Sequence, residues 1–358
     1  MEIFLILAAL FVAFNNGAND NFKGLATVWG SDTLNYRQAL ILATIATLAG
    51  SLASWLLADT LVQQFSGRGL VPNDVATAPS FILSVAGGAA VTVFAATWLG
   101  LPISTTHALI GSLVGAGLGH SSAVHFDALA KNFFLPLLLS PLLAAALGVA
   151  LCRLLRRRNA KNDCACVVPV EVSALATTAG LRERVAVFPS IVIADGQTCD
   201  NMPTMARGSI AGILDRLHVV SALTICFSRG LNDTPELAAL LITAKFFSRN
   251  TSVALIGGVM AIGGIFYARK VAETMSHRIT RMDASQGLAA NLITATLVLF
   301  ASKFGLPVST THVSVGSIAG VGAGGQTLNM HALRNVLLSW IATLPLAAMT
   351  AWLIARSI

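Results

Sequence analysis

Long apolar stretches, rather than short alternating patterns, organise this chain. Most of them reach the roughly 20 residues with which an α-helix crosses a lipid bilayer. Apolar runs of that length predict membrane-spanning helices. The stretches lie near residues 2–29, 38–61, 79–99, 103–119, 131–155, 217–247, 250–270, 286–303, 307–324 and 332–356.

Two of these stretches, 103–119 and 307–324, are short and rich in glycine, serine and threonine. We expect an interrupted or re-entrant helix at each of them. Backbone that leaves helical structure at membrane depth is tolerated only where it is buried in protein or lines a cavity. The pattern therefore predicts an all-α polytopic membrane protein with about 10–12 transmembrane segments.

A polar, charged stretch divides the chain. We predict a first transmembrane repeat over 1–155, a cytoplasmic middle loop over 156–215 and a second transmembrane repeat over 216–358. Within the loop, Val185–Ala194 is apolar but too short to span a bilayer. We expect a small cytoplasmic element there.

Charge is scarce in this sequence. Charged residues make up 11% and hydrophobic residues 55%, with a mean hydropathy of +0.75, whereas a soluble domain carries roughly 25% charged residues. This composition excludes an ordinary cytosolic enzyme, a secreted disulfide scaffold and a nucleic-acid-binding domain. The net charge of +7 bears on membrane orientation and does not indicate a nucleic-acid partner.

Basic residues concentrate in two loops. The stretch from Arg153 to Arg216 holds nine of the 23, and the stretch from Arg269 to Arg281 holds four. The positive-inside rule places both loops in the cytoplasm, and the two crossings predicted between them agree with this. Five crossings on either side of the middle loop put both termini outside. We expect a multi-pass protein of the cell (inner or plasma) membrane.

Three of the five cysteines, Cys164, Cys166 and Cys199, lie in the middle loop. They could bind a metal, although their spacing matches no common zinc pattern. Reduced thiols in a cytoplasmic loop are the interpretation that we favour.

Two motifs recur in the same order in both halves of the chain. Residues 100–107 (GLPISTTH) match residues 305–312 (GLPVSTTH) at seven of eight positions, with an offset of 205. Residues 14–20 (FNNGAND) match residues 227–233 (FSRGLND) with an offset of 213. An odd number of crossings per half gives the halves opposite orientations. This predicts an inverted-topology repeat with its substrate site near the membrane midplane.

Three carboxylates, Asp20, Asp233 and Glu236, lie within predicted spans. An intramembrane carboxylate costs about 2.5–3.5 kcal/mol on insertion scales and therefore requires a partner. One interpretation is a buried ion pair with a neighbouring lysine or arginine. We favour a site for a small coupling cation, because Asp20 and Asp233 occupy matched positions. Each follows an asparagine, Asn19 or Asn232, whose carbonyl oxygen can complete the shell of the cation.

Each GLP(I/V)STTH segment places a proline before three hydroxyls. The proline ends the preceding helix, and the hydroxyls then lie where free N–H groups and the positive helix end favour an anion. A single hydroxyl there could simply be an N-cap. The histidines that follow, His107 and His312, could relay a proton or stay neutral and structural. Three hydroxyls, present twice, favour an oxyanion site formed by Ser104, Thr105, Thr106, Ser309, Thr310 and Thr311.

Three charged residues are expected to modulate the site: Lys23, Arg229 and Glu236. Lys23 and Glu236 occupy matched positions, three residues after Asp20 and Asp233. Lys23 could therefore pair with Glu236 across the repeats, or it could neutralise Asp20. Either arrangement would alter the cation site.

With both motifs present in both halves, the chain resembles the inorganic phosphate transporter (PiT) family of sodium/phosphate symporters. The resemblance covers roughly residues 10–155 and 215–356 and is carried by Gly17–Asp20, Gly230–Asp233 and the paired GLP(I/V)STTH segments. It implies a homodimeric secondary transporter of inverted repeats that moves phosphate with Na⁺ or, in many bacterial members, H⁺. Some relatives carry sulfate. The resemblance assigns the six hydroxyls to the oxyanion, and the coupling cation and the edge of the substrate to Asn19, Asp20, Asn232 and Asp233.

The chain departs from the family pattern after each Asn-Asp pair. The family usually continues Asn-Asp-Val-Ala-Asn, whereas Lys23 and Glu236 stand here where the second asparagine is expected. We hypothesise that the Lys23 ammonium replaces one bound cation, or that Glu236 carries a proton. Arg229 replaces the usual histidine and could attract or bind the anion.

These observations favour an ion-coupled symporter of inorganic phosphate, with sulfate or another oxyanion as the second candidate substrate. A site for HPO₄²⁻ benefits from a proton acceptor such as Asp20 or Asp233, which favours phosphate. A passive anion channel is disfavoured, because carboxylates beside the path repel an anion unless a cation binds with it. No nucleophile–base pair indicates an enzyme. The expected partners are phosphate, the lipid bilayer and a second copy of the chain, with no cofactor beyond the coupling Na⁺ or H⁺.

Overall fold

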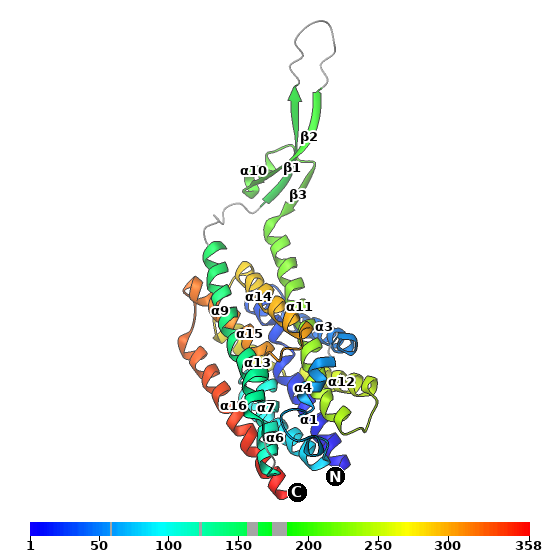
Figure 1. Ribbon diagram of the computed structural model, residues 1–358. Coiled ribbons are helices and arrows are strands. Elements are labelled where there is room, and N and C mark those ends of the chain that lie inside the picture. The colour runs from blue at the N-terminus through cyan, green and yellow to red at the C-terminus, as the bar shows by residue number, and fades with distance from the viewer. Residues whose placement is uncertain (58, 122–123, 156–163, 174–184) are drawn as a thin grey trace. The chain divides into compact units, whose positions relative to one another are not determined.

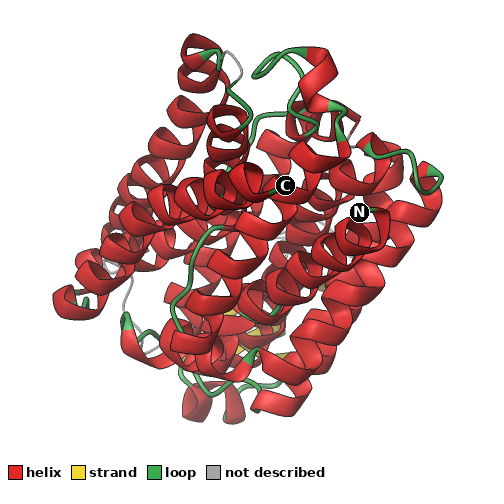
Figure 2. Ribbon diagram, turned by 90° about the horizontal axis from the view of Figure 1, so that it is seen from below, coloured by secondary structure: helices red, strands yellow, loops and turns green. Residues whose placement is uncertain are grey.

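The computed structural model describes residues 1–57, 59–121, 124–155, 164–173 and 185–358. These residues are mainly helical, and Figure 2 shows helices joined by loops, with strands confined to a small part of the chain. Every apolar stretch marked in the sequence contains a helix. The predicted all-α class is therefore confirmed.

The α-helices carry the labels used in Figure 1. Three short elements that are not labelled there are η1, a 3₁₀ turn, and η2 and η3, which are π-helical turns. The first half contains α1 (Glu2–Asp20), η1 (Lys23–Leu25), α2 (Ala26–Gly30), α3 (Tyr36–Leu57), α4 (Asp59–Phe65), α5 (Asn73–Ala76), α6 (Pro79–Leu99), α7 (Thr105–Gly119), α8 (Phe126–Leu129), η2 (Ala130–Phe134) and α9 (Leu135–Leu155). The second half contains α11 (Ile210–Thr243), α12 (Arg249–Tyr267), α13 (Arg269–Glu273), η3 (Thr274–Arg278), α14 (Ala284–Lys303), α15 (Thr310–Gly325) and α16 (Met330–Ser357).

Eight helical segments among the described residues are long and apolar enough to cross a membrane. The two short stretches of the sequence form α7 and α15, which have 15 and 16 residues. Both are shorter than the roughly 20 residues of a full crossing. They are the interrupted elements that the sequence predicts.

A glycine with positive φ ends the helix before each of these short elements. Gly100 has a φ of +72° after α6, and Gly305 has a φ of +64° after α14. Glycine is favoured there because a side chain destabilises the left-handed conformation. A proline two residues later keeps the helix from resuming. The chain stays non-helical until Ser104 or Ser309, and residues 102–104 and 307–309 are buried.

The two halves interlock through their short helices. α7 of the first half packs against α16 of the second, and α15 of the second half contacts α9 of the first. A Cβ atom on Gly115 would lie 1.9 Å from the backbone oxygen of Ala348, and one on Gly320 would lie 2.2 Å from that of Ala145. The two glycines are 205 residues apart, so matching helices make matching contacts. This arrangement is consistent with an inverted repeat.

Residues Leu154–Leu217 form a separate compact unit. Its three-stranded antiparallel sheet has the order β2-β1-β3. The expected element at Val185–Ala194 is strand β2. The basic cluster at residues 156–158 lies outside the described residues. The other elements of the unit are β1 (Cys164–Ser173), α10 (Gly196–Asp200) and β3 (Ala206–Ser209).

The core of this small unit consists of Cys164, Cys166 and Cys199. Cys166 and Cys199 form a disulfide, and the Cys164 sulfur lies 3.6 Å from that of Cys166. This corrects the expectation of reduced thiols for Cys166 and Cys199, whereas Cys164 is a free cysteine. Residues two apart on a strand share one face of the sheet, and α10 brings Cys199 against that face of β1.

Candidate functional site

The two duplicated motifs meet in one buried group of side chains, which we call the central polar cluster. Its members come from the end of α1 and η1, the middle of α11, and the first turns of α7 and α15. Every member is at most 4% exposed. The cluster consists of Asn16, Asn19, Asp20, Lys23, Thr105, Thr106, Arg229, Asn232, Asp233, Glu236 and Thr311.

Lys23 forms a buried ion pair with Asp20, one helical turn before it. Its Nζ also donates to Asn19 Oδ1 at 2.8 Å, to the Ile103 backbone oxygen at 2.7 Å and to Thr311 Oγ1 at 2.6 Å. Of the two pairings that the sequence left open, the structure therefore has Lys23 with Asp20. Thr311 belongs to the other half of the chain, so this contact joins the two halves.

Glu236 has the reciprocal contacts on the other side. Its carboxylate accepts hydrogen bonds from Thr106 Oγ1 at 2.8 Å and from Asn232 Nδ2 at 2.9 Å. Thr106 belongs to the first half and Glu236 to the second. The third hydroxyl of each STT triplet thus reaches the charged residue that follows the Asn-Asp pair of the opposite half.

Arg229 and Asn16 connect the two aspartates. Arg229 Nε donates to Asp233 Oδ2 at 3.1 Å, and Nη2 donates to Asn16 Oδ1 at 3.2 Å. Asn16 Nδ2 in turn donates to Asp20 Oδ2 at 3.0 Å and to Thr105 Oγ1 at 2.9 Å. Sequence reasoning missed Asn16, although it stands at the position matched to Arg229. Arg229 Nη1 is buried and has no hydrogen-bond partner among the residues that the structure describes.

The two motif asparagines bind the broken segments to the cluster. Asn19 Nδ2 donates to Thr97 Oγ1 at 2.9 Å. Asn232 Oδ1 accepts from Ser302 Oγ at 3.2 Å, and its Nδ2 donates to the Val308 backbone oxygen at 3.3 Å. Thr97 and Ser302 are again 205 residues apart. These contacts fix the non-helical backbone beside the aspartates.

The first hydroxyl of each triplet is an N-cap. Ser104 Oγ accepts from the His107 backbone N–H, and Ser309 Oγ accepts from that of His312, both at 3.1 Å. One hydroxyl of each triplet therefore caps its helix, as the capping interpretation predicts. The other N–H groups of the first turn have no acceptor within the helix, because a helix start leaves such groups unsatisfied. An anion at this end would be favoured by them and by the helix dipole.

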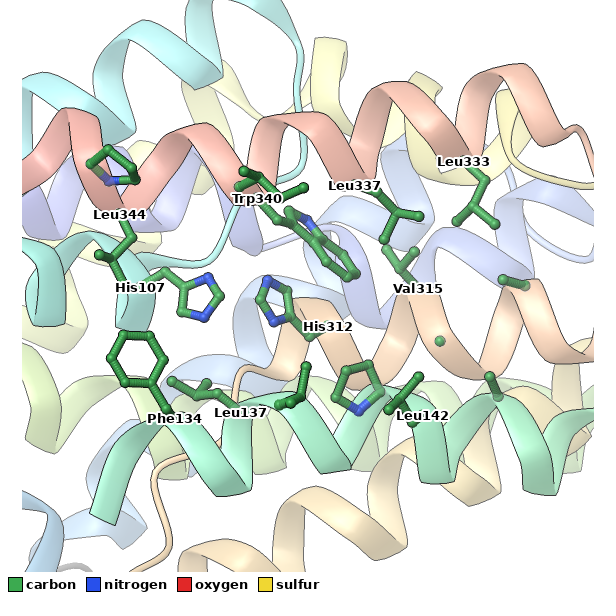
Figure 3. A pocket seen from close by; sticks show the side chains of 17 residues that line it. His107, Phe134, Leu137, Leu142, His312, Val315, Leu333, Leu337, Trp340 and Leu344 are labelled. Atoms are coloured by element: carbon green, nitrogen blue, oxygen red, sulfur yellow. The ribbon is translucent and has the colours of Figure 1, made fainter. Parts of the chain in front are cut away.

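A cavity of about 660 Å³ lies between α9 and α16. His107 and His312 point toward one another in it, and the Trp340 ring lies beside His312 (Figure 3). The two histidine rings are 4.4 Å apart between centroids, and the His312 and Trp340 rings are 3.7 Å apart. The remaining lining is mainly aliphatic side chains such as Leu137 and Leu337. This apolar surface does not suit a doubly charged anion, so the central polar cluster is the candidate site.

Comparison with known proteins identifies the family of this chain. A model of the phosphate transporter family matches residues 16–351. The chain is 26% identical to a putative phosphate permease of Pyrococcus furiosus, over 99% of this chain and 95% of that protein. It is 29% identical to inorganic phosphate transporter 2-1, chloroplastic, of Arabidopsis thaliana, over 97% of this chain and 70% of that protein.

A solved structure titled "The sodium-dependent phosphate transporter" shares the fold. The two superpose with a TM-score of 0.76 and 21% identity, over 99% of this chain and 98% of the other. The resemblance inferred from the duplicated motifs is confirmed by the family match, which covers both halves and the middle unit. This chain belongs to the phosphate transporter family, a family of membrane transporters and not of enzymes.

Proposed function

We propose that this protein is a secondary active symporter that carries inorganic phosphate together with Na⁺ or H⁺. One observation carries the proposal: both Asn-Asp pairs and threonines from both STT triplets lie in one buried cluster. A cluster that combines carboxylates, amides, hydroxyls and an arginine can bind a cation and an anion side by side. Simultaneous binding of two ions is what symport requires.

The anion would bind at the starts of α7 and α15, where the broken helices present hydroxyl and N–H donors. The unpartnered Nη1 of Arg229 supports this, since a buried guanidinium donor without an acceptor favours an incoming oxyanion. Asp20 and Asp233 stand at the edge of this site. Phosphate is favoured over sulfate, because HPO₄²⁻ can donate its proton to such a carboxylate. The proposed oxyanion ligands are Ser104, Thr105, Thr106, Ser309, Thr310 and Thr311.

The sites for a coupling cation would be the Asn-Asp pairs, Asn19 with Asp20 and Asn232 with Asp233. Lys23 Nζ already occupies the oxygens of Asn19 and Asp20, so the pair in the second half is the one open to a mobile cation. Carboxylate and amide oxygens are hard ligands that fit Na⁺ or accept a proton. In the second half, Glu236 and Thr106 add further oxygens beside Asn232. A cation bound there would offset the repulsion between these carboxylates and the phosphate. In a passive channel no bound cation would offset this repulsion.

The membrane setting is part of the proposal. The concentration of basic residues between Arg153 and Arg216 supports a cytoplasmic middle unit and external termini in the cell membrane. The broken helices near the midplane support alternating access around a fixed site. Assembly as a homodimer is proposed from the family resemblance.

Reconstitution into liposomes tests the proposal. Labelled phosphate and labelled sulfate are supplied outside, under an imposed Na⁺ gradient, an imposed H⁺ gradient or neither. We expect phosphate to accumulate only with a gradient, and more than sulfate. Transport of neither anion would contradict the proposal. Equilibration of phosphate without any imposed gradient would indicate a channel.

A matched pair of variants tests the site. Asp233→Asn should abolish gradient-driven phosphate uptake, because it removes the carboxylate that faces Arg229 and Asn232. Asp127→Asn, on the exposed start of α8, should retain uptake. Equal uptake by both variants would remove Asp233 from the site.

A further inference from the structure

We infer that Lys23 is a built-in coupling cation, whose ammonium fills one of two matched cation positions. The second position, at Glu236, is then left to a single mobile monovalent cation. This inference rests on the proposed function, which it deepens by fixing the number of ions that accompany phosphate.

The surroundings of Lys23 Nζ are those of a bound cation. Four oxygens surround it: the Asp20 carboxylate, the Asn19 amide oxygen, the Ile103 backbone oxygen and the Thr311 hydroxyl. An ammonium has only three N–H donors. Four oxygens lie within 2.8 Å of Nζ, which is one more than three hydrogen bonds can use. A carboxylate, an amide, a carbonyl and a hydroxyl are also the oxygen donors that bind hard metal cations. A Na⁺ ion does not fit at this position while Nζ occupies it.

The matched position in the other half has the opposite charge. Glu236 corresponds to Lys23 through the 213-residue offset, and Thr106 corresponds to Thr311 through the 205-residue offset. Asn232 and Thr106 hold the Glu236 carboxylate as Asn19 and Thr311 hold the ammonium. Within the described parts of the chain, Glu236 has hydrogen bonds but no ion pair. Its oxygens fit a Na⁺ ion or a proton.

The charges of the cluster before phosphate binds give the number of cations that neutralise the empty site. Lys23 and Arg229 contribute two positive charges, and Asp20, Asp233 and Glu236 contribute three negative ones. With all five ionised, the formal charge is 2 − 3 = −1. One monovalent cation neutralises the cluster, and in a buried setting an unpaired charge is strongly disfavoured. An asparagine at position 23 would make the charge −2 and require two cations. A glutamine at position 236 would make it 0 and require none.

Phosphate binding to the purified full-length protein in detergent measures this number. The dissociation constant for phosphate is determined by titration calorimetry against Na⁺ concentration at fixed pH, and against pH without Na⁺. By linkage, each cation taken up with phosphate changes the affinity about tenfold per tenfold change in cation activity, below saturation. For a tenfold change in cation activity, we expect the phosphate affinity to change about tenfold in the unaltered protein and about 100-fold in Lys23→Asn. In Glu236→Gln we expect the affinity not to depend on the cation.

Two controls accompany these variants. Lys303→Asn changes an exposed residue and Glu273→Gln a partly exposed one, both outside the cluster, and both variants should keep the tenfold dependence. A dependence on Na⁺ alone identifies the mobile cation as Na⁺, and a dependence on pH alone identifies it as a proton.

Several results would overturn the inference. One is a 100-fold dependence in the unaltered protein, which would mean two mobile cations and can be measured even if a variant fails to fold. Another is an unchanged dependence in both Lys23→Asn and Glu236→Gln. Failure of the unaltered protein to bind phosphate under any cation condition would instead contradict the proposed function.

Discussion

The ion pair between Asp20 and Lys23 allows the energetics of the central polar cluster to be tested directly. Asp20→Asn leaves the Lys23 ammonium among neutral oxygens. Lys23→Met leaves the Asp20 carboxylate with the neutral donors Asn16 and Thr105. Both side chains are at most 3% exposed. Removing one partner of a buried pair costs about 3–5 kcal/mol, because the other charge stays buried without compensation.

The double variant Asp20→Asn/Lys23→Met distinguishes this charge effect from a loss of shape. It contains neither charge, so its loss of unfolding free energy should be smaller than the sum of the two single losses. We expect a coupling energy of about 2 kcal/mol or more, near the upper part of the range for residues in contact. Comparing the unaltered protein with the double variant gives the cost of the packing changes without an uncompensated charge.

Unfolding free energies can be measured by SDS titration in mixed micelles, followed by tryptophan fluorescence. The exposed pair Arg269–Glu273 provides the matched control, and the corresponding cycle there should give no more than about 0.5 kcal/mol. Additive losses at Asp20 and Lys23, or single losses below about 1 kcal/mol, would refute the reasoning.

Three further predictions concern other parts of the molecule. Gly115→Ala should lower the midpoint of thermal unfolding, because the added methyl group forces α7 away from Ala348 and costs about 1–3 kcal/mol. Gly258→Ala, which has open space around it, should leave the midpoint unchanged. Arg229→Lys should weaken phosphate binding about tenfold in a calorimetric titration, since an ammonium cannot replace the planar fork; unchanged affinity would remove Arg229 from the anion site. Reducing the disulfide at Cys199 should speed tryptic cleavage of the middle unit, which loses about 2–4 kcal/mol; equal cleavage rates with and without dithiothreitol would contradict this.

The helices could be predicted well because membrane depth enforces a simple pattern. A long apolar stretch has no other way to satisfy its backbone in lipid, so each marked stretch became a helix. The breaks at Gly100 and Gly305 were visible for a local reason, since a glycine followed shortly by a proline favours the end of a helix.

Pairings within the cluster could be predicted only in part. The sequence offered two acidic partners for Lys23, Asp20 and Glu236, and did not decide between them. The choice follows from distance along one helix: Asp20 is one turn away, whereas Thr106 and Asn232 already hold Glu236. The importance of Asn16 depends on contacts with two other elements, α7 and α11, which spacing along the chain does not reveal.

The middle unit was the least predictable part. Its strands are short and belong to no membrane-spanning pattern, and only the apolar run at Val185–Ala194 indicated an element there. The disulfide joins Cys166 to Cys199 across 33 positions of sequence. That pairing depends on the placement of α10 against β1, and thus on tertiary structure.

The interlocking of α7 with α16 and of α15 with α9 has a consequence for the origin of this architecture. A chain of one half alone would expose the glycine-lined face of its short helix, and would need a second half to cover it. A single-repeat ancestor would therefore have to assemble as an antiparallel pair of identical subunits, with every residue present twice. Joining two such copies in one chain would remove that identity. Only then could one copy acquire a lysine and the other a glutamate at the matched position, which would turn two equal ion positions into one position with a fixed charge and one with a mobile charge.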